Sequence, residues 1–169
     1  MKWIGAILLI CATTLIGVEI SSKLSRRPKE IRQLKTALQI LEAEIVYSQA
    51  TLADAFSQIA QQLSQPVSSL FQAIASKLNT SNDLTYTWGE EVNRFLGNSS
   101  VGRDEAEVLL QFGETLGQYD IVQQKKYIQL SITHLDRILI EAQENYQRYG
   151  KMFKNLGVLA GLFLVLLLI

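Results

Sequence analysis

The chain has 169 residues, 16 basic and 16 acidic side chains, and 48% hydrophobic residues. This length fits one domain, and a net charge of zero argues against a general nucleic-acid-binding protein. A single cysteine excludes a disulfide framework, and a single histidine argues against a histidine metal cluster or a hydrolase triad. These averages conceal a segregation of charge, because residues 1–18 carry only Lys2 and residues 155–169 carry no charge.

The two apolar chain ends are predicted to be membrane-spanning helices. Trp3–Val18 has 16 residues and would extend about 24 Å as a helix, and Leu156–Ile169 has 14 residues, about 21 Å. Both are shorter than a hydrocarbon core of about 30 Å, but flanking residues can extend them. A cleaved signal peptide, a lipoprotein modified at Cys11 and a buried core helix are the alternatives for the first segment. They are disfavoured because no Ala-x-Ala site follows, Ile10 precedes Cys11, and the same composition recurs at the far end.

Basic residues flank both predicted spans on the side of the central domain, whereas the outer flanks carry only Lys2. This distribution predicts a cytoplasmic central domain with both termini across the membrane. The basic residues expected to lie beside lipid headgroups are Lys23, Arg26, Arg27 and Lys29. In the second span, Gly157 and Gly161 have the small-xxx-small spacing that allows helices to pack closely.

The sequence predicts an all-α fold, with a cytoplasmic antiparallel bundle of about six helices at residues 21–154. A transmembrane helix at residues 1–20 precedes it, and another at residues 155–169 follows. Pro28 is predicted to lie in the first turn of a new helix, and the last helix is predicted to run from about Asp120 into the second span. The apolar seams that define the helices lie at residues 31–45, 52–63, 67–78, 84–95, 108–116 and 128–153, with loops at 79–83 and 97–102.

Charge is unevenly distributed along the predicted bundle. Residues 20–36 have six basic and one acidic residue, residues 37–120 have three and eleven, and residues 121–154 have six and three. The short central helices therefore form an acidic head, which we predict to dock a basic cytoplasmic partner. The alternative is that an acidic head merely avoids anionic lipid. The residues predicted to form the exposed docking face are Glu90, Glu91, Arg94, Asp104, Glu105 and Glu107.

No catalytic residue, metal site, cofactor or small-molecule substrate is predicted. The stretch Gly97–Gly102 is not followed by the Lys-Ser/Thr of a phosphate-binding loop, and His134 has no nucleophile at a motif spacing. Acidic clusters at helix starts and on exposed faces are far commoner than catalytic carboxylate pairs. Trp88 is predicted to be a core residue, with an interface anchor as the alternative.

A short motif near the last helix resembles a family signature. Residues 112–120 read FGETLGQYD and are followed by Gln124, which resembles the FG..LG..D...Q signature of the stage III sporulation protein AB family. The apolar N-terminus, the basic helix after it, Trp88 before an acidic pair and the LGVLAG tail extend the resemblance over essentially the whole chain. Its motif residues Leu116, Gly117, Asp120 and Gln124 are expected to shape the turn into the long helix. Asp120 would be the N-cap, and direct partner contact is the alternative.

The resemblance implies a part in the sporulation channel complex between mother cell and forespore, in the mother-cell-side membrane. The family is similar to the cytoplasmic domain of the inner-membrane platform protein of type II secretion and type IV pili, which contacts a hexameric secretion ATPase. Here that ATPase would be the stage III sporulation AA protein. Platform proteins have two such domains and more membrane helices, so their proposed pumping geometry does not carry over.

We therefore predict a non-enzymatic membrane adaptor that docks this ATPase and other membrane components of the channel, without nucleic acid. The alternative is a self-assembling membrane scaffold without an ATPase partner. Copies of this scaffold would assemble through Gly157, Gly161 and the seam at residues 128–153.

Overall fold

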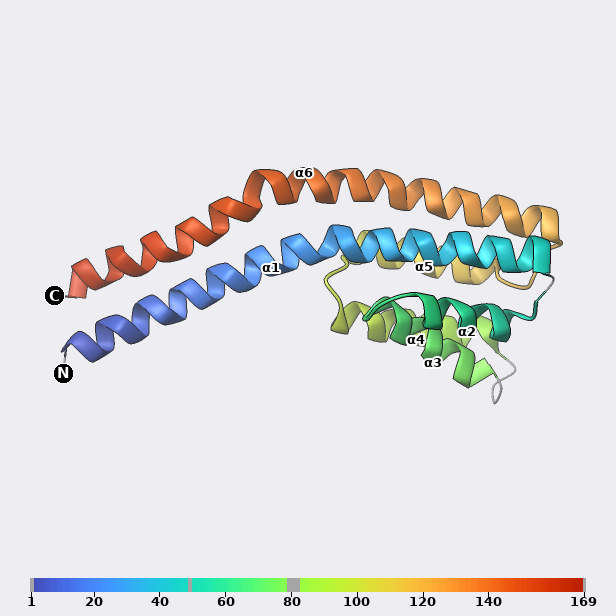
Figure 1. The fold of residues 1–169 in the computed structure, drawn as a ribbon, viewed down its shortest axis with the longest axis horizontal. Helices are drawn as coiled ribbons and strands as arrows, with labels where there is room; N and C mark the ends of the chain where they lie inside the picture. Colours follow the sequence, from blue (N-terminus) through green and yellow to red (C-terminus); the bar gives the residue numbers. More distant parts are fainter. Residues whose placement is uncertain (1, 49, 79–82, 169) are drawn as a thin grey trace. The chain divides into compact units, whose positions relative to one another are not determined.

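A computed structural model shows a helical protein and describes residues 2–48, 50–78 and 83–168. Side chains are described between residues 12 and 150 of these ranges and at some later positions. The described chain contains six α-helices, one π-helical turn and no strand (Figure 1). The predicted all-α bundle of about six helices is confirmed. The elements are α1 (Lys2–Ala43), η1 (Glu44–Ser48), α2 (Leu52–Gln62), α3 (Val67–Leu78), α4 (Leu84–Asn98), α5 (Arg103–Thr115) and α6 (Ile121–Leu168).

Pro28 does not begin a helix, contrary to the prediction, but lies inside α1. Proline removes one backbone donor and crowds the preceding turn, which costs a helix interior about 3 kcal/mol. The helix continues because Ile31, Leu34 and Leu38 follow directly and are fully buried. Burying each such side chain contributes about 1.5–3 kcal/mol, so packing outweighs the cost of the proline.

The chain divides into two compact units. One consists of Met1–Pro28 and Glu141–Ile169, and we call it the terminal unit; the other, Lys29–Ile140, is the bundle. Both α1 and α6 contribute a segment to each unit, and the boundary in α1 falls at Pro28. The proline therefore marks a division within a helix rather than its start.

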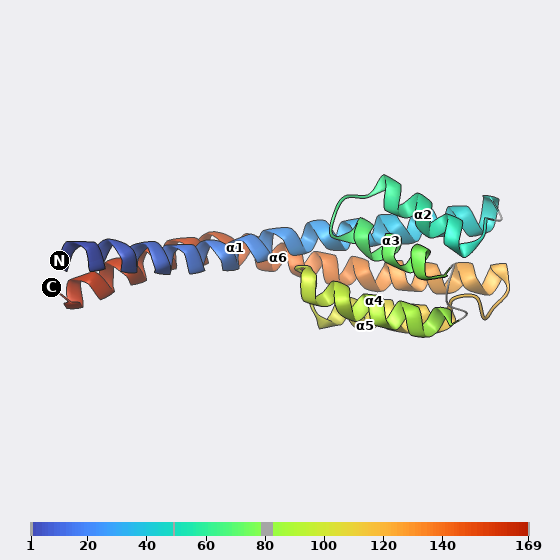
Figure 2. The same cartoon turned by 90° about the horizontal axis from the view of Figure 1, so that it is seen from below.

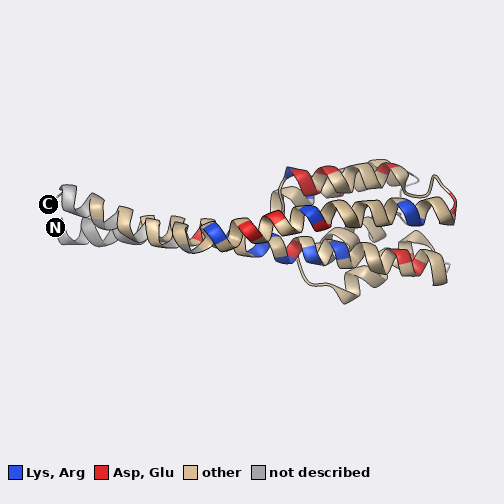
Figure 3. Ribbon diagram, turned by 90° about the horizontal axis from the view of Figure 1, so that it is seen from above, with Lys and Arg blue, Asp and Glu red and all other residues tan. Residues whose placement is uncertain are grey.

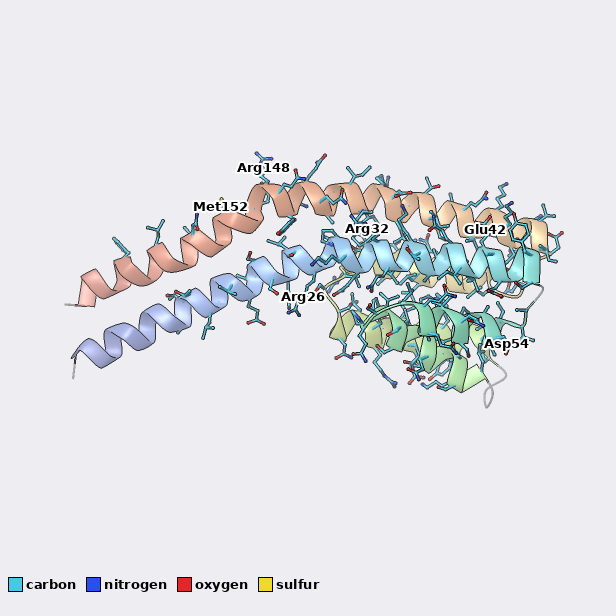
Figure 4. The ribbon with its side chains drawn as sticks, viewed as in Figure 1. Arg26, Arg32, Glu42, Asp54, Arg148 and Met152 are labelled. Atoms are coloured by element: carbon cyan, nitrogen blue, oxygen red, sulfur yellow. The ribbon has the colours of Figure 1, made fainter. Side chains whose placement is uncertain are left out.

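Within the bundle, α1 and α6 run antiparallel (Figure 2). Lys35 forms an ion pair with Asp136, and Glu42 accepts a hydrogen bond from Gln129 at 3.0 Å. Lys125 lies 3.7 Å from the same carboxylate of Glu42, which is labelled in Figure 4. Between Lys35 and Glu42, α1 advances seven residues, and α6 retreats seven from Asp136 to Gln129. Two turns of each helix therefore face one another in a fixed register.

The core of the bundle consists of the seams that the apolar spacing predicts. Four seam positions of α1 and two of α6 are fully buried, although each of these two seams also has a half-buried position, Ile45 in the first and Ile132 in the last. The fully buried residues are Ile31, Leu34, Leu38 and Leu41 on α1, and Ile128 and Leu135 on α6. Because buried apolar area is the main source of folding free energy, these two long helices form the frame on which the short helices pack.

The short helices meet in an aromatic cluster around Trp88, which is 1% exposed. Its ring lies 5.7 Å from that of Phe56, 6.0 Å from that of Phe71 and 5.6 Å from that of Phe112, measured between centroids. These rings come from α2, α3, α4 and α5, and tilted and edge-on pairs at such distances are favourable. The prediction that Trp88 is a core residue is confirmed.

In the terminal unit, the Ser21 hydroxyl of α1 donates a hydrogen bond to the Gly150 carbonyl of α6 at 2.8 Å. Apolar side chains on both helices are exposed there, among them Met152, which is labelled in Figure 4. Within the described residues, no helix has a stretch that is both long enough and apolar enough to cross a membrane. The predicted spans at residues 1–20 and 155–169 fall largely on residues whose side chains are not described, as do Gly157 and Gly161.

Candidate functional site

The motif residues are placed where α5 ends and α6 begins. Gly117 has φ +73°, a left-handed conformation that an L side chain adopts only with strain, and it lies two residues past the end of α5. Its backbone N–H donates to Oε1 of Gln124 at 3.3 Å, and Gln124 itself is 4% exposed. Asp120 accepts a hydrogen bond from the N–H of Gln123 at 2.8 Å, so the expected N-cap of the long helix is present.

The first glycine of the motif, Gly113, has a packing role that the sequence did not reveal. A Cβ placed on Gly113 would lie 2.6 Å from Nε1 of Trp88, closer than real Cβ contacts. The indole is fixed there because Nε1 donates to the carbonyl of Leu109 at 2.7 Å in the buried interior. Only a glycine lets α5 approach the indole so closely. The motif therefore has one glycine for packing and one for the turn.

The predicted docking residues of α4 form an ion network instead of an open acidic face. Lys77 of α3 lies 2.8 Å from Glu90 and 2.7 Å from Glu91, and Arg94 lies 3.1 Å from Glu91. Hydrogen bonds to Glu90 and Glu91 raise the pKa of Lys77, and the hydrogen bond from Lys77 lowers the pKa of Glu90. Two cations and two carboxylates neutralise one another, so this surface attracts a basic partner only weakly.

Glu91 and Glu105 are buried, which corrects the prediction that they belong to an exposed face. Glu91 is 2% exposed, because its position in α4 faces the core between Trp88 and Phe95. Glu105 is fully buried and accepts a hydrogen bond from the Gly102 N–H at 2.8 Å at the start of α5. Of the six predicted docking residues, Glu90, Arg94, Asp104 and Glu107 are exposed.

Glu30 holds the loop between α4 and α5, which the sequence did not predict. This side chain of α1 is 7% exposed, and its carboxylate accepts a hydrogen bond from the Ser100 N–H at 2.6 Å. Val101 beside it is buried. The predicted loop at 97–102 is therefore short, since α4 reaches Asn98, and two carboxylates fix it. Of the other predicted loop, residues 79–82 lie outside the described residues.

One end of the bundle exposes large apolar side chains. The Cβ position of Gly117 lies 3.7 Å from Leu52 and 3.7 Å from Leu84, so the α5–α6 turn lies beside the starts of α2 and α4. The turn η1 contacts α2 at the same end, where Figures 1 and 2 also place the end of α1 and the start of α6. We call this surface the aromatic end. Its members, with exposed fractions, are Tyr47 (79%), Tyr86 (70%), Tyr119 (47%), Ile121 (48%) and Val122 (78%).

The predicted lipid-proximal residues follow one another along α1. Lys23, Arg26 and Lys29 are exposed, and Arg27 is half-buried. Figure 3 shows the charged residues in the described parts of both long helices, and Figure 4 labels Arg26. In the predicted α6 seam, Ile128, Leu135 and Leu139 are buried inside the bundle. That part of the seam is therefore occupied within the chain and does not face a second copy.

The described residues offer no group of three or more histidine, cysteine and carboxylate side chains that could hold a metal ion. His134 lies exposed on α6. The exposed features of the described surface are the aromatic end, the ion network on α3 and α4, and the exposed carboxylates on α5.

Comparison with known proteins gives one consistent result. The family model described as stage III sporulation protein AB matches residues 2–169. A protein of Bacillus subtilis (strain 168), stage III sporulation protein AB, is 44% identical over 169 residues, which is 99% of each chain. A solved structure of stage III sporulation protein AB is 43% identical, covers 72% of this chain and 96% of its own, and superposes with a TM-score of 0.68.

Proposed function

The chain belongs to the stage III sporulation protein AB family, and from this premise we propose that it is a non-enzymatic membrane adaptor. In this proposal it is part of a secretion-like channel between mother cell and forespore. Its bundle lies in the mother-cell cytoplasm and docks a hexameric secretion-type ATPase, the stage III sporulation AA protein. Both termini lie across the membrane, where they meet other membrane components of the channel.

The exposed apolar side chains of the terminal unit support membrane anchoring. On α1 the exposed residues include Leu15 at 68% and Ile16 at 59%, and on α6 they include Leu159 at 62% and Phe163 at 65%. Apolar patches of this kind in a folded protein normally contact lipid or another protein. The exposed Lys23 and the neighbouring basic residues follow directly on α1, as expected for side chains at the level of anionic headgroups.

The observation that carries ATPase docking is the aromatic end. Tyrosines dominate protein interfaces because they combine a large apolar ring with a polar hydroxyl. Three tyrosines and two aliphatic residues cluster here, although most of the outer surface of the bundle is polar. The motif turn fixes the backbone that carries Tyr119, Ile121 and Val122 through Gly117 and Gln124, which lowers the entropy lost on binding.

This placement moves the expected contact away from the acidic residues of α4. Glu90 and Arg94 are exposed, but Glu90 pairs with both Arg94 and Lys77, and breaking exposed ion pairs gains or loses little. The acidic character of the head then contributes to the rate of encounter with a basic partner rather than to the affinity of the complex.

Binding of the purified ATPase to the full chain in lipid nanodiscs tests this proposal. Tyr119→Ala and Val122→Asp should each weaken binding about tenfold or more, as truncation of a buried interface anchor does. The matched control is the double variant Glu90→Ala and Arg94→Ala, which should change binding less than threefold and alter mainly its salt dependence. Loss of binding in the control with full binding in Tyr119→Ala would place the contact on α4. Absence of any binding by the unchanged chain would leave the scaffold without an ATPase as the function.

A further inference from the structure

Two exposed helix faces of the bundle lie outside the core and the motif turn and have opposite charge. The first is on α6, where Lys126, Leu130, Thr133, Arg137 and Ile140 are all exposed. Their spacings of four, three, four and three place them on one stripe of the helix. The inward positions Gln124, Ile128 and Leu135 are buried, so this stripe lies on the opposite side of α6. We call it the α6 stripe.

The α6 stripe combines apolar and cationic groups. Leu130 is 52% exposed and Ile140 is 58% exposed. The charged residues of the stripe are both positive: Lys126 precedes Leu130, and Arg137 lies between Leu130 and Ile140. An occupant of this stripe must therefore offer carboxylates spaced about eleven residues apart on a helix, or about 16 Å, with tolerance for apolar contact between them.

The second face is on α5 and has the opposite charge. Asp104, Glu107, Gln111 and Glu114 are exposed and follow at spacings of three, four and three, while Leu109 and Phe112 face the core. Gln111 donates a hydrogen bond to Glu107 at 3.3 Å, which keeps that carboxylate on the ridge. We call this surface the α5 ridge.

The charged residues of the two faces lie at similar levels along the axis of the bundle. Consecutive antiparallel helices joined by a short turn bring residues equally far from the turn to the same level. Counted from Asp120, Lys126 lies six residues after and Glu114 six before. Arg137 lies seventeen residues after Asp120, level with Asp104, which lies sixteen before it in the first turn of α5. Glu107, thirteen residues before Asp120, lies in the next turn. Positive groups on one face therefore stand level with negative groups on the other.

We propose that the α6 stripe of one copy docks the α5 ridge of a second copy, so that the chain assembles side by side. The proposal rests on the proposed membrane anchoring only for the shared orientation of neighbouring copies, which makes the paired helices antiparallel. Glu114 then faces Lys126, Asp104 lies level with Arg137, Glu107 lies about one turn away from that level, and Leu130 packs near Gln111. Because the two contacting surfaces differ, the contact is heterologous, and a pair of copies keeps one free stripe and one free ridge to which further copies can add.

A charge-swap experiment tests this contact directly. Variant A is Glu107→Lys with Glu114→Lys, and variant B is Lys126→Glu with Arg137→Glu, each in the full chain in detergent. Sedimentation at low salt should show association of the unchanged chain and at least tenfold weaker self-association of A alone and of B alone. An equimolar mixture of A and B should associate again, because the basic ridge of A meets the acidic stripe of B and the reverse pairing also holds. Gln72→Lys on α3 is the control for added positive charge and should associate like the unchanged chain.

Several outcomes overturn the proposal. A monomeric unchanged chain, normal self-association of A or of B, or a mixture that stays dissociated would each exclude this contact. A melting curve for each variant verifies the fold, and Glu107→Gln with Glu114→Gln repeats the test without reversed charge if A does not fold. None of these measurements involves the ATPase, and Tyr119 and Val122 are unchanged in A and B, so failure of self-association and failure of ATPase docking are separately visible.

Discussion

The bundle and the terminal unit use segments of the same two helices, yet their outer faces differ. In the bundle the exposed large apolar residues gather at the aromatic end, apart from Leu130 and Ile140 on α6. In the terminal unit they recur along both helices, at Leu15 and Ile16 of α1 and at Leu159 and Phe163 of α6. The same helix can thus have a mainly polar outer face in one segment and an apolar outer face in another, and its outward residues determine which surroundings suit each segment. The bundle has an internal core, whereas the terminal unit exposes apolar side chains, which our proposal assigns to contact with the membrane.

The internal core of the bundle is most sensitive at Gly113. Gly113→Ala should destabilise the bundle by about 3 kcal/mol, because the added methyl overlaps the fixed indole of Trp88. Denaturant unfolding of the full chain in detergent measures this, with Trp3→Phe so that Trp88 alone is fluorescent. Gly97→Ala is the matched control, since its Cβ would meet nothing within 4 Å. It should stabilise by up to about 1 kcal/mol through helix propensity, and equal effects of the two changes would contradict the packing account.

The buried carboxylate of Glu30 comes next in expected effect. Glu30→Ala should cost about 2 kcal/mol, because the Ser100 N–H loses a charged acceptor at 2.6 Å. Hydrogen exchange of the Ser100 and Val101 amides should accelerate in the same variant. Glu114→Ala, an exposed carboxylate on α5, serves as the control and should stay within about 0.5 kcal/mol of the unchanged chain. Unaltered exchange at Ser100 would show that the contact does not hold the loop.

Gly117 tests the turn that supports the aromatic end. Gly117→Ala should cost about 1–2 kcal/mol, because φ is +73° while the neighbouring space, 3.7 Å from Leu52 and Leu84, accepts a methyl group. Gly117→Asn should cost less than the alanine variant, since asparagine tolerates the left-handed region better. Thermal melts of the three chains check the order, and an alanine variant as stable as the glycine would argue against a conformational role.

The smallest effect is expected from pH, through the network on α3 and α4. The lowered pKa of Glu90 gives stability that is present above its usual value of 4.5 and is lost as pH falls through the lowered value. The raised pKa of Lys77 gives stability that is present below its usual value of 10.5 and is lost as pH rises through the raised value. Lys77→Met should flatten both limbs of a plot of stability against pH. A profile identical to that of the unchanged chain would remove the network as a source of stability.

Local patterns predicted most of the helices. The seams beginning at Leu52, Val67 and Leu84 became α2, α3 and α4, and Asp120 caps α6 as expected. The prediction that Pro28 begins a helix was wrong because the preference of proline for the first turn is a local rule. Burial of Ile31 and Leu34 outweighs it and keeps Pro28 inside α1.

The burial of two docking residues could have been recognised from spacing alone. Glu91 lies three residues after Trp88 and four before Phe95, and Glu105 lies four residues before Leu109, so both occupy positions of the buried seam. By contrast, the contacts of Glu30 with Ser100 and of Gly113 with Trp88 join residues far apart in the chain. No local pattern contains that information.

The contrast between the two units leads to one direct test of membrane anchoring with a cytoplasmic bundle. Cys11→Ser removes the single native thiol, and new cysteines are then placed at Gln61, exposed on α2, or at Lys2. Gln61 is preferable to the 97–102 loop, which Glu30 and Glu105 hold in place. In sealed inside-out vesicles a membrane-impermeant maleimide should label the cysteine at 61 at once and the cysteine at 2 only after detergent is added. Immediate labelling at both positions, or at position 2 alone, would contradict the account.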